Sequence, residues 1–443
     1  MSGEHGNGRL AAWVALLAAA CFVAALVALL VRNWVTLLIV LAALTVAAAA
    51  GWLTVTRRGA ARLVALVCAV AALAGGAIAM IARGAVDELV VFIGAGVLLA
   101  VAAGRAVRKS RQAHAAATAP PPRKRSGKGV LLMNPKSGGG KVERFDLVAE
   151  AKRRGIEPVL LGPDDDLMTL AREVAGAAGV IGMAGGDGSQ ALVAQVAMEQ
   201  DVDFVCVPAG TRNHLALDLG LDRDDVVGAL DAFGSELGRS IDLAFVNERI
   251  FVNNVSLGIY AEIVQSEAYR DAKLATAEKL LPELLGPRAE PFDLRFVGPD
   301  GVERRSAQLL LVSNNPYELD SLVAAGSRAR LDTGRLGIVA VEITGPAEAA
   351  KLASLEAVRR LQTFDGWSEW SASAFQVDSG SPVAAGIDGE AVVLEPPLRF
   401  TIAPSALRVR LPPSAPGLSP AALRPKLDRA SLRELWEIAT GRR

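Results

Sequence analysis

The chain has 443 residues, 51% of them hydrophobic, and its 47 basic residues balance its 47 acidic ones. This length exceeds what one ordinary core holds and predicts two or three folding units. Three cysteines exclude a disulfide framework. The long apolar runs fall within residues 10–104, whereas residues 129–443 mix short apolar stretches with charges. We therefore predict a membrane part followed by a soluble part.

Four apolar runs lie in the first part of the chain, at residues 10–31, 34–55, 63–82 and 87–104. They are close to the roughly 20 residues that cross a bilayer as a helix. Lys and Arg gather before the first run, after the second and after the fourth, which predicts that both chain ends are cytoplasmic. No charged residue lies in the middle of a run, so we expect no ion pathway. The sequence predicts a multi-pass cell-membrane protein whose soluble part faces the cytoplasm.

A basic segment, residues 105–128, joins the two parts and holds three consecutive prolines at 120–122. Its composition predicts an extended linker. The positive charge has two interpretations: it binds anionic lipid headgroups, or it only fixes the topology and stays solvated. We expect no nucleic-acid partner, and no pattern indicates an oligomeric state.

Three short apolar runs in the soluble part, at residues 129–133, 180–183 and 204–207, each lead into a glycine-containing turn. Apolar residues at helical spacing follow the turns. Strands that alternate with helices predict an α/β domain, residues 129–238, with a parallel sheet covered on both faces. Such sheets bind ligands at the carboxyl ends of their strands, where the three turns are expected to lie.

The three turns have the composition of phosphate-binding loops. They contain, in order, Asn134, Pro135, Ser137 and Gly138, then Gly185, Gly186, Asp187, Gly188 and Ser189, and then Gly210, Thr211 and Asn213. Glycine lets backbone N–H groups approach phosphate oxygens, and a following helix N-terminus favours an anion. The first turn is not a Walker A motif, because Pro135 stands where glycine is required. Each turn alone fits a simple tight turn, but three in consecutive units predict a site for a nucleotide polyphosphate.

Asp187 lies between two glycines of the second turn. A carboxylate beside phosphate-binding amides repels phosphate unless a cation lies between them, which predicts Mg²⁺ at this position. The alternative is a helix N-cap, a role that aspartate fills well. The two roles are compatible.

Six motifs occur in an order that resembles the signature of the diacylglycerol kinase catalytic family, over residues 129–412. They are the three turns and the segments at 240–258, Ser313-Asn314-Asn315-Pro316-Tyr317 and Asp388-Gly389-Glu390. The ordered set is far more specific than any one of its members.

The resemblance implies a kinase with two domains. The first is an α/β nucleotide domain of the NAD kinase and diacylglycerol kinase type, and the second is a β-rich substrate domain at residues 239–412. Strand-like stretches at 292–297, 306–312, 336–342 and 398–402 support the second domain. The resemblance further implies ATP and Mg²⁺ as cofactors and a membrane lipid hydroxyl as acceptor, with diacylglycerol, giving phosphatidic acid, as the first candidate.

Residue roles also follow from the resemblance. The turn residues named above would bind the nucleotide. Asp187, Asp242 and Asp332 would hold magnesium, and Asp187 would also be catalytic. Glu390 would be the general base that takes the proton of the acceptor hydroxyl. The alternative for Asp388-Gly389 is a simple hairpin turn.

The chain departs from the family pattern at three places. Thr333 follows Asp332 where the family often has a second aspartate. His214 follows Asn213 where an aspartate is usual, with Asp218 nearby as a substitute. Ser189 stands where threonine is commoner, and it keeps the hydroxyl.

Two other classes of function share parts of this pattern. A kinase of soluble substrates, of the NAD kinase or phosphofructokinase type, shares the Gly-Gly-Asp-Gly turn. A catalytically impaired scaffold would keep the fold and only bind lipid or nucleotide.

The final segment, residues 413–443, begins as a loop. An amphipathic helix is predicted at 428–440, with Leu432, Leu435, Trp436 and Ala439 on one face. We expect this helix to dock on the kinase core, and membrane contact is the alternative.

Overall fold

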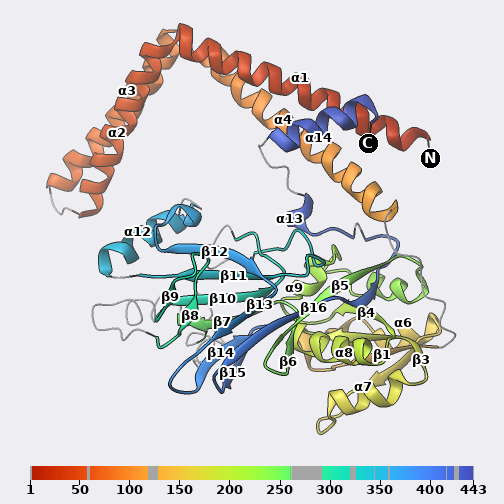
Figure 1. Cartoon of the computed structure of the whole chain (residues 1–443). Helices are drawn as coiled ribbons and strands as arrows, with labels where there is room; N and C mark the ends of the chain where they lie inside the picture. Colours follow the sequence, from red (N-terminus) through yellow and green to blue (C-terminus); the bar gives the residue numbers. More distant parts are fainter. Residues whose placement is uncertain are drawn as a thin grey trace. The chain divides into compact units, whose positions relative to one another are not determined.

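The structure is a computed structural model that describes residues 2–56, 60–117, 128–259, 261, 292–319, 326–343, 345–357, 360–415, 417–423 and 429–442. The chain divides into two compact units. The helical unit comprises Met1–Arg111 and Arg424–Arg443, and the sheet unit comprises Gln112–Leu423 (Figure 1).

The helical unit contains long helices at each of the four predicted spans. Its helices are α1 (Ser2–Arg32), α2 (Trp34–Thr56), α3 (Ala60–Ala82), α4 (Val86–Ala117) and α14 (Arg429–Thr440). Among the residues that the structure describes, two segments, Arg9–Arg32 and Val86–Arg108, are by length and composition alone long and apolar enough to cross a membrane. The apolar stretches found in α2 and α3, Trp34–Ala48 and Leu66–Ala82, are shorter. The structure supports two candidate spans, and the four-span topology stays a prediction.

Helix α4 differs from the sequence prediction at its end. It continues to Ala117, through residues where the sequence predicts the beginning of an extended linker. Asp87 and Glu88 lie in its first turn, where negative charge stabilises a helix N-terminus. The rest of the predicted linker, residues 118–127, lies outside the described residues.

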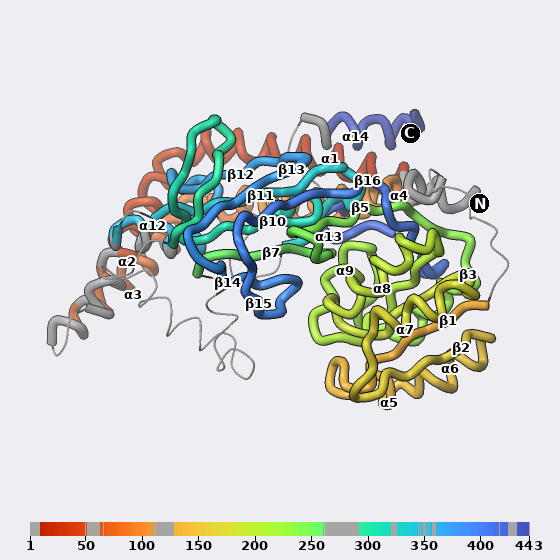
Figure 2. Tube along the Cα trace, turned by 60° about the horizontal axis from the view of Figure 1, so that its bottom comes forward, coloured from red at the N-terminus to blue at the C-terminus, as the bar shows by residue number. Residues whose placement is uncertain are grey.

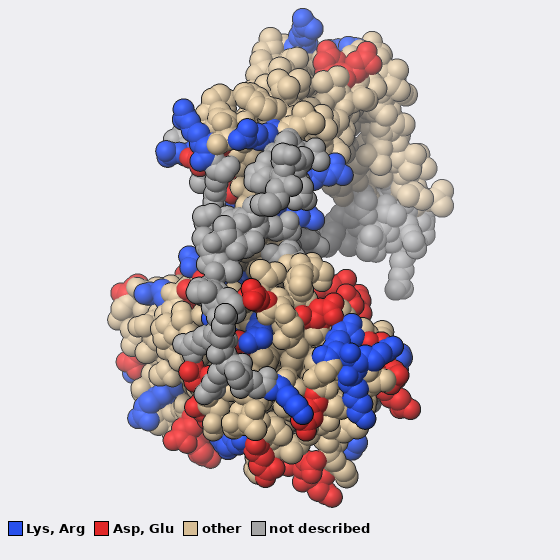
Figure 3. Space-filling view, turned by 90° about the vertical axis from the view of Figure 1, so that its right-hand side faces the viewer, with Lys and Arg blue, Asp and Glu red and all other residues tan. Residues whose placement is uncertain are grey.

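Small residues bring the long helices together in two pairs. A Cβ added at Gly76 of α3 would lie 3.2 Å from Ala43 Cβ of α2. The rings of Phe22 on α1 and Phe92 on α4 stack with centroids 4.4 Å apart. Most large apolar side chains of these helices are exposed, and Figure 3 shows long uncharged stretches on this unit, whereas charges of both signs cover the visible face of the sheet unit.

The C-terminal helix α14 belongs to the helical unit. Its apolar residues Leu435, Ile438 and Ala439 are buried together with alanines and a valine of α1 and α4, namely Ala12, Ala15, Ala102, Ala103, Ala106 and Val107. The expectation that this helix docks on the kinase core is therefore wrong. The small side chains of α1 and α4 leave room for the larger Leu and Ile side chains, a complementarity that the sequence of α14 alone does not reveal.

The first sheet of the sheet unit has eight strands. They are β1 (Lys128–Met133), β2 (Glu157–Leu160), β3 (Ala178–Gly185), β4 (Asp203–Pro208), β5 (Gly238–Val246), β6 (Arg249–Phe251), β13 (Ala374–Val377) and β16 (Leu398–Arg410). The order is β2-β1-β3-β4-β16-β5-β6, with β13 paired to β16. Strands β2, β1, β3, β4 and the end of β16 are parallel, whereas β5 and β6 are antiparallel. The predicted α/β fold is confirmed, but the sheet is mixed because β5 and β13 run antiparallel to β16.

Helices cover both faces of the first sheet, so its central strands are continuously buried. Every residue of β3 and β4 is buried, as expected for strands enclosed on two sides. The covering elements are α5 (Lys141–Arg144), α6 (Leu147–Arg153), α7 (Leu167–Ala175), α8 (Asp187–Glu199), α9 (His214–Asp218) and the 3₁₀ segment η2 (Gly228–Gly234) (Figure 2). Helices α7 and α8 contribute to one apolar core and α6 and η2 to another.

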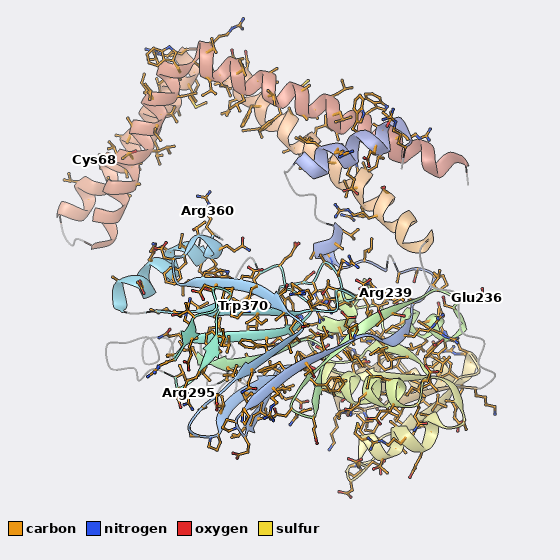
Figure 4. All side chains as sticks on the ribbon, in the orientation of Figure 1. Cys68, Glu236, Arg239, Arg295, Arg360 and Trp370 are labelled. Atoms are coloured by element: carbon orange, nitrogen blue, oxygen red, sulfur yellow. The ribbon has the colours of Figure 1, made fainter. Side chains whose placement is uncertain are left out.

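The second sheet has six antiparallel strands in the order β12-β11-β10-β7-β14-β15. They are β7 (Asn254–Gly258), β10 (Leu309–Asn314), β11 (Leu336–Val341), β12 (Trp367–Ala372), β14 (Val383–Ile387) and β15 (Glu390–Leu394). The other described elements are β8 (Phe296–Val297), β9 (Glu303–Arg304), α12 (Pro346–Ala357), η1 (Ser137–Gly139), η4 (Leu361–Thr363) and α13 (Pro420–Leu423). The ring of Trp370 (Figure 4) stacks on Phe296 with centroids 6.4 Å apart. This β-rich region confirms the predicted second domain.

Strands β5 and β16 belong to both cores of the sheet unit. Ile241 and Leu407 are buried in the core of the first sheet, whereas Val246 and Phe400 are buried in the core beside the second sheet. Strand β5 begins at Gly238, next to the predicted boundary between residues 238 and 239, which stays a prediction. Two shared strands fix the two sheets against each other, which positions loops from both.

Candidate active site

The three glycine turns meet at the carboxyl ends of β1, β3 and β4. A Cβ added at Gly138 would lie 2.3 Å from Ala209 O, and one added at Gly210 would lie 2.4 Å from Gly186 Cα. Only glycine permits these approaches. The structure thus brings together the three turns that the sequence predicts to bind nucleotide.

The first turn is open on its outer side. Gly138, Gly139 and Gly140 have φ values of 56°, 71° and 81°, which glycine adopts without strain. No atom lies within 4 Å of a Cβ added at Gly139 or Gly140. The Asn134 side chain accepts a hydrogen bond from Lys136 N at 3.0 Å. Asn134 and Ser137 are half-buried and Pro135 is exposed. The inner part of the turn is thus packed against the protein, and its outer part is accessible.

Asn213 shapes the third turn. Its Oδ1 accepts a hydrogen bond from Gly210 N at 2.9 Å, and its Nδ2 donates to Pro208 O at 3.0 Å and to Gly210 O at 2.9 Å. These contacts use both N–H donors of the Asn213 side-chain amide and hold the backbone of Gly210 in place. Asn213 is therefore a structural residue of the nucleotide turns, while the adjacent Thr211 is exposed.

Asp187 is buried, with 7% of its surface exposed. Its Oδ2 accepts a hydrogen bond from His214 N and its Oδ1 one from Leu215 N, both at 3.0 Å. It therefore caps the N-terminus of α9, a neighbouring helix, whereas its own helix α8 has Gly186 at the N-cap position and no capping hydrogen bond from a side chain. Each carboxylate oxygen keeps a second lone pair, so the cap leaves capacity for a cation.

The other two predicted magnesium ligands lie in different settings. Asp242 is 1% exposed, and its Oδ1 and Oδ2 accept hydrogen bonds from Ser405 N and Gly334 N, each at 2.7 Å. Asp332 is exposed and pairs with Arg330 at 2.9 Å. Among the described residues, no group of three or more His, Cys, Asp or Glu side chains is arranged to hold a metal. The structure does not bring Asp187, Asp242 and Asp332 together.

Thr333 takes over a structural contact in the loop that contains Asp332. Its backbone N–H and its hydroxyl both donate to Asn315 Oδ1, at 2.8 Å and 2.5 Å. A second carboxylate at this position would face the same amide oxygen without a proton to donate. Hydrogen bonds between uncharged groups, from Thr333 to Asn315, therefore hold the loop that contains Asp332.

Glu390 comes from the second sheet and reaches the second glycine turn. It is the first residue of β15, directly after the turn of the β14–β15 hairpin. A Cβ added at Gly188 would lie 2.3 Å from Glu390 Oε1, so the carboxylate lies against the first turn of α8. The side chain is 63% exposed, and its Oε2 is 3.7 Å from the Arg249 guanidinium. The predicted general base and the predicted nucleotide turn are adjacent.

Asp388 anchors this hairpin. Asp388 and Gly389 have φ values of 50° and 89°, typical of a two-residue hairpin turn. The Asp388 carboxylate accepts hydrogen bonds from the backbone N–H groups of Val252, Asn253 and Asn254 at 2.9, 2.8 and 3.1 Å. Burial raises the pKa of Asp388 to about 7, although these N–H donors oppose the shift. Both interpretations of the motif hold: Asp388-Gly389 forms the turn, and the turn presents Glu390.

The sequence gives no signal for Arg328, which is the central residue behind the site. Arg328 is fully buried, and its Nε donates to Asp218 Oδ2 at 2.6 Å. Its Nη atoms donate to Val252 O, Asn314 O and Asn253 Oδ1 at 2.6, 2.7 and 2.9 Å. Asp218, expected to substitute for a family aspartate, is instead the partner of this buried arginine.

The Arg328 contacts connect both sides of the site. Asp218 ends α9, whose first residues are capped by Asp187. Asn253 belongs to the segment that Asp388 holds. Arg328 therefore links the helix beside the nucleotide turns to the loop that supports the Glu390 hairpin.

His214 lies at the start of α9. Its Nδ1 is buried and has no hydrogen-bond partner among the residues that the structure describes. Burial lowers the pKa of His214, against the opposing charge of Asp187. The imidazole is accordingly neutral at pH 7, and only its backbone N–H takes part in the Asp187 contact.

Comparison with known proteins identifies the class of this domain. Residues 128–246 match the family model of the diacylglycerol kinase catalytic domain. The diacylglycerol kinases of Mycobacterium tuberculosis strains CDC 1551 / Oshkosh and ATCC 25618 / H37Rv are each 30% identical to the chain over 199 residues. This match covers 42% of the chain and 63% of each relative. The chain thus matches less than two thirds of the length of these curated relatives.

A solved structure of a diacylglycerol kinase from Bacillus anthracis str. Sterne has the same fold. It aligns with a TM-score of 0.51 at 20% identity and covers 66% of this chain and 99% of its own. Residues 128–246 thus match the catalytic-domain model of the diacylglycerol kinase family, which confirms the resemblance inferred from the motifs.

Proposed function

We propose that the chain is a membrane-anchored, ATP-dependent lipid kinase that transfers the γ-phosphate of ATP to a lipid hydroxyl. Diacylglycerol, which would become phosphatidic acid, is the first candidate acceptor. One observation carries the proposal: the Glu390 carboxylate lies against Gly188 of the second glycine turn. A proton acceptor from one sheet and a phosphate-binding turn from the other thus share one site.

The glycine turns suit the phosphates of ATP. They lie at the carboxyl ends of parallel strands, where open α/β sheets bind ligands. Helix α8 begins at Asp187, within the second turn, and a helix N-terminus attracts anions. The open outer side of Gly139 and Gly140 leaves space for phosphate oxygens.

Asp187 is the residue that would hold Mg²⁺. This ion commonly binds one or two carboxylates together with substrate phosphates and water. One carboxylate with free lone pairs beside the phosphate turns fits that pattern without a cluster of three acidic groups. When bound, the ion would neutralise charge on the phosphates.

Glu390 is placed to receive the acceptor proton. As the acceptor oxygen forms its bond to the γ-phosphorus, the bond from that phosphorus to the bridging oxygen breaks and ADP leaves. The hydroxyl proton passes to the Glu390 carboxylate. The 63% exposure of this side chain leaves it accessible to a bulky lipid headgroup.

Membrane attachment is supported by the helical unit. The segments Arg9–Arg32 and Val86–Arg108 are candidate spans, and the basic residues that follow position 104 favour a cytoplasmic location and contact with anionic headgroups. Anchoring in the membrane that contains the acceptor favours a lipid substrate over NAD or a sugar phosphate.

The test is a phosphorylation assay with the full-length protein in mixed lipid vesicles. Labelled ATP and Mg²⁺ are supplied with diacylglycerol, a total lipid extract, NAD or fructose 6-phosphate. We expect label in the lipid fraction. Label in a soluble acceptor would favour the soluble-substrate kinase, and ATP binding without transfer to any acceptor would favour the scaffold.

Glu390→Gln tests the assigned base in the same assay. Removal of a positioned base lowers kcat by about 10²–10⁴-fold, whereas ATP affinity should change little because the carboxylate acts on the acceptor. Glu395→Gln is the matched control, since Glu395 is an exposed glutamate just after the same strand. If Glu390→Gln loses ATP binding in step with turnover, Glu390 is a nucleotide or structural residue.

A further inference from the structure

Helix α14 attaches to the ends of α1 and α4 through a packed face. Leu435, Ile438 and Ala439 are 4%, 5% and 6% exposed. Beside this apolar contact, Glu434 accepts hydrogen bonds from Arg111 Nε and Nη2 at 3.2 and 2.8 Å. Glu434 is 9% exposed and Arg111 28%, so this two-pronged pair is largely shielded from water and fixes the rotation of α14.

The positions of these contacts along α1 and α4 locate α14 at a membrane border. The candidate spans begin at Arg9 and end at Arg108. With a rise of about 1.5 Å per residue, Ala12 and Ala15 lie roughly 5 and 9 Å inside the border of α1. By the same rise, Ala103 and Ala106 lie roughly 8 and 3 Å inside that of α4. Interfacial helices bury their apolar face about 5–10 Å into the boundary between headgroups and acyl chains.

The exposed surface of α14 next to its buried face, termed the outer face, carries two large apolar side chains. Leu432 and Trp436 are 52% and 49% exposed, and they lie one turn apart on the helix. The Trp436 ring contacts the Trp13 ring of α1 edge-on, with centroids 5.9 Å apart. Trp13 is itself 44% exposed and the nearby Leu10 65%. The outer face of α14 is thus continuous with a surface of α1 that would face lipid, and tryptophan is enriched at membrane–water interfaces.

The charges of α14 match an anionic membrane surface. Arg433 is 83% exposed and pairs with Glu437 at 3.3 Å, and Arg442 follows the last turn of the helix. Arg9 lies against the end of α14, since a Cβ added at Gly441 would meet its guanidinium. Basic residues at this level attract anionic headgroups.

We propose that α14 is an interfacial anchor. Its inner face binds the α1–α4 pair, and its outer face, with Leu432 and Trp436, rests in the headgroup layer of an anionic bilayer. The sheet unit is then attached to the membrane at both of its ends, through α4 and through α14. This inference rests on the membrane anchoring under the proposed function and is independent of the proposed chemistry.

The test separates the two attachments in the full-length protein. A specific protease site is inserted between residues 118 and 127, and the protein is reconstituted in phosphatidylcholine–phosphatidylglycerol vesicles. After cleavage, flotation shows whether the fragment from residue 128 onward stays with the vesicles. We expect retention, because α14 still holds it. Release of the wild-type fragment would overturn the proposal.

Variants on the two faces identify what holds the fragment. Leu435→Asp removes the inner contact and should lower retention about tenfold or more, the effect expected from one buried leucine. Leu432→Ser with Trp436→Ser tests the outer face and should also lower retention. Leu160→Asp, at an exposed leucine of the sheet unit, is the matched control. Unchanged retention in the inner-face variant would mean that the sheet unit binds the membrane itself, and unchanged retention in the outer-face variant would exclude the bilayer contact.

Reversing the charges of the Arg111–Glu434 pair provides a second test in case Leu435→Asp disturbs the helix. Glu434→Arg should release the fragment, and Glu434→Arg with Arg111→Glu should restore retention. Lack of rescue would contradict the pairing. Flotation does not depend on turnover, so a protein that floats but lacks kinase activity would refute the proposed function and leave the anchor standing. Failure of the uncut protein to float would refute the membrane anchoring itself.

Discussion

The buried pair of Arg328 and Asp218 should dominate the stability of the sheet unit. Arg328→Met removes a guanidinium that makes four side-chain hydrogen bonds. It leaves the Asp218 carboxylate buried with only the Arg328 backbone N–H as a described donor. Breaking one partner of a buried ion pair costs about 3–5 kcal/mol, which is a large part of the stability of a typical domain.

The double variant Asp218→Asn with Arg328→Met should cost much less than the sum of the two single variants. The asparagine is neutral, so the penalty for an unpaired buried charge disappears. Three oxygens that Arg328 contacts still lose their donor, so the double variant stays less stable than the wild type. The coupling free energy is therefore the quantity to measure.

Pulse proteolysis in urea measures the unfolding free energy of the sheet unit within the full-length protein. Arg330→Met is the matched control, because Arg330 is 66% exposed and pairs only with Asp332 on the surface. We expect the control to lie within about 0.5 kcal/mol of the wild type. A result for Arg328→Met within about 1 kcal/mol of the wild type would refute the assignment of Arg328 as the central structural residue.

Three further predictions concern the site. Asp187→Asn should lower kcat by about 10²–10³-fold, because the negative charge is lost. It should also lower the unfolding free energy by about 1–3 kcal/mol, because one of the two oxygens that cap α9 becomes a donor. An enzyme assay measures the first effect, and urea unfolding measures the second. Gly188→Ala should lower kcat without unfolding, since the new Cβ displaces the flexible Glu390 carboxylate; Gly176→Ala, where the added Cβ meets no atom within 4 Å, is the control. Burial raises the pKa of Asp388 to about 7, so between about pH 4 and pH 7 the folded state binds more protons than the unfolded state, and the unfolding free energy should fall as the pH rises. Equal slopes for the wild type and Asp388→Asn would contradict this last expectation.

The sequence determined the local elements around the nucleotide turns. Strand β3 and residues 204–207 of β4 form apolar runs, and the helices that follow the turns have periodic apolar positions, so both types of element were predictable from spacing alone. The glycines at 138 and 210 were predictable as close approaches, because no other residue fits such contacts. The order of the motifs also indicated that Glu390 belongs to the site.

Only the tertiary structure decided the contacts between distant segments. Strand β16 enters the first sheet between β4 and β5, and the sheet is mixed because β5 is antiparallel to β16. Asp187 caps α9, the helix that follows the next strand along the chain. Arg328 pairs with Asp218, which is far from it in sequence. Helix α14 binds α1 and α4, against the sequence-based expectation. The spacing of apolar residues specifies which face of an element is buried, but its partner depends on matching shape and charge between surfaces that meet only in the folded chain.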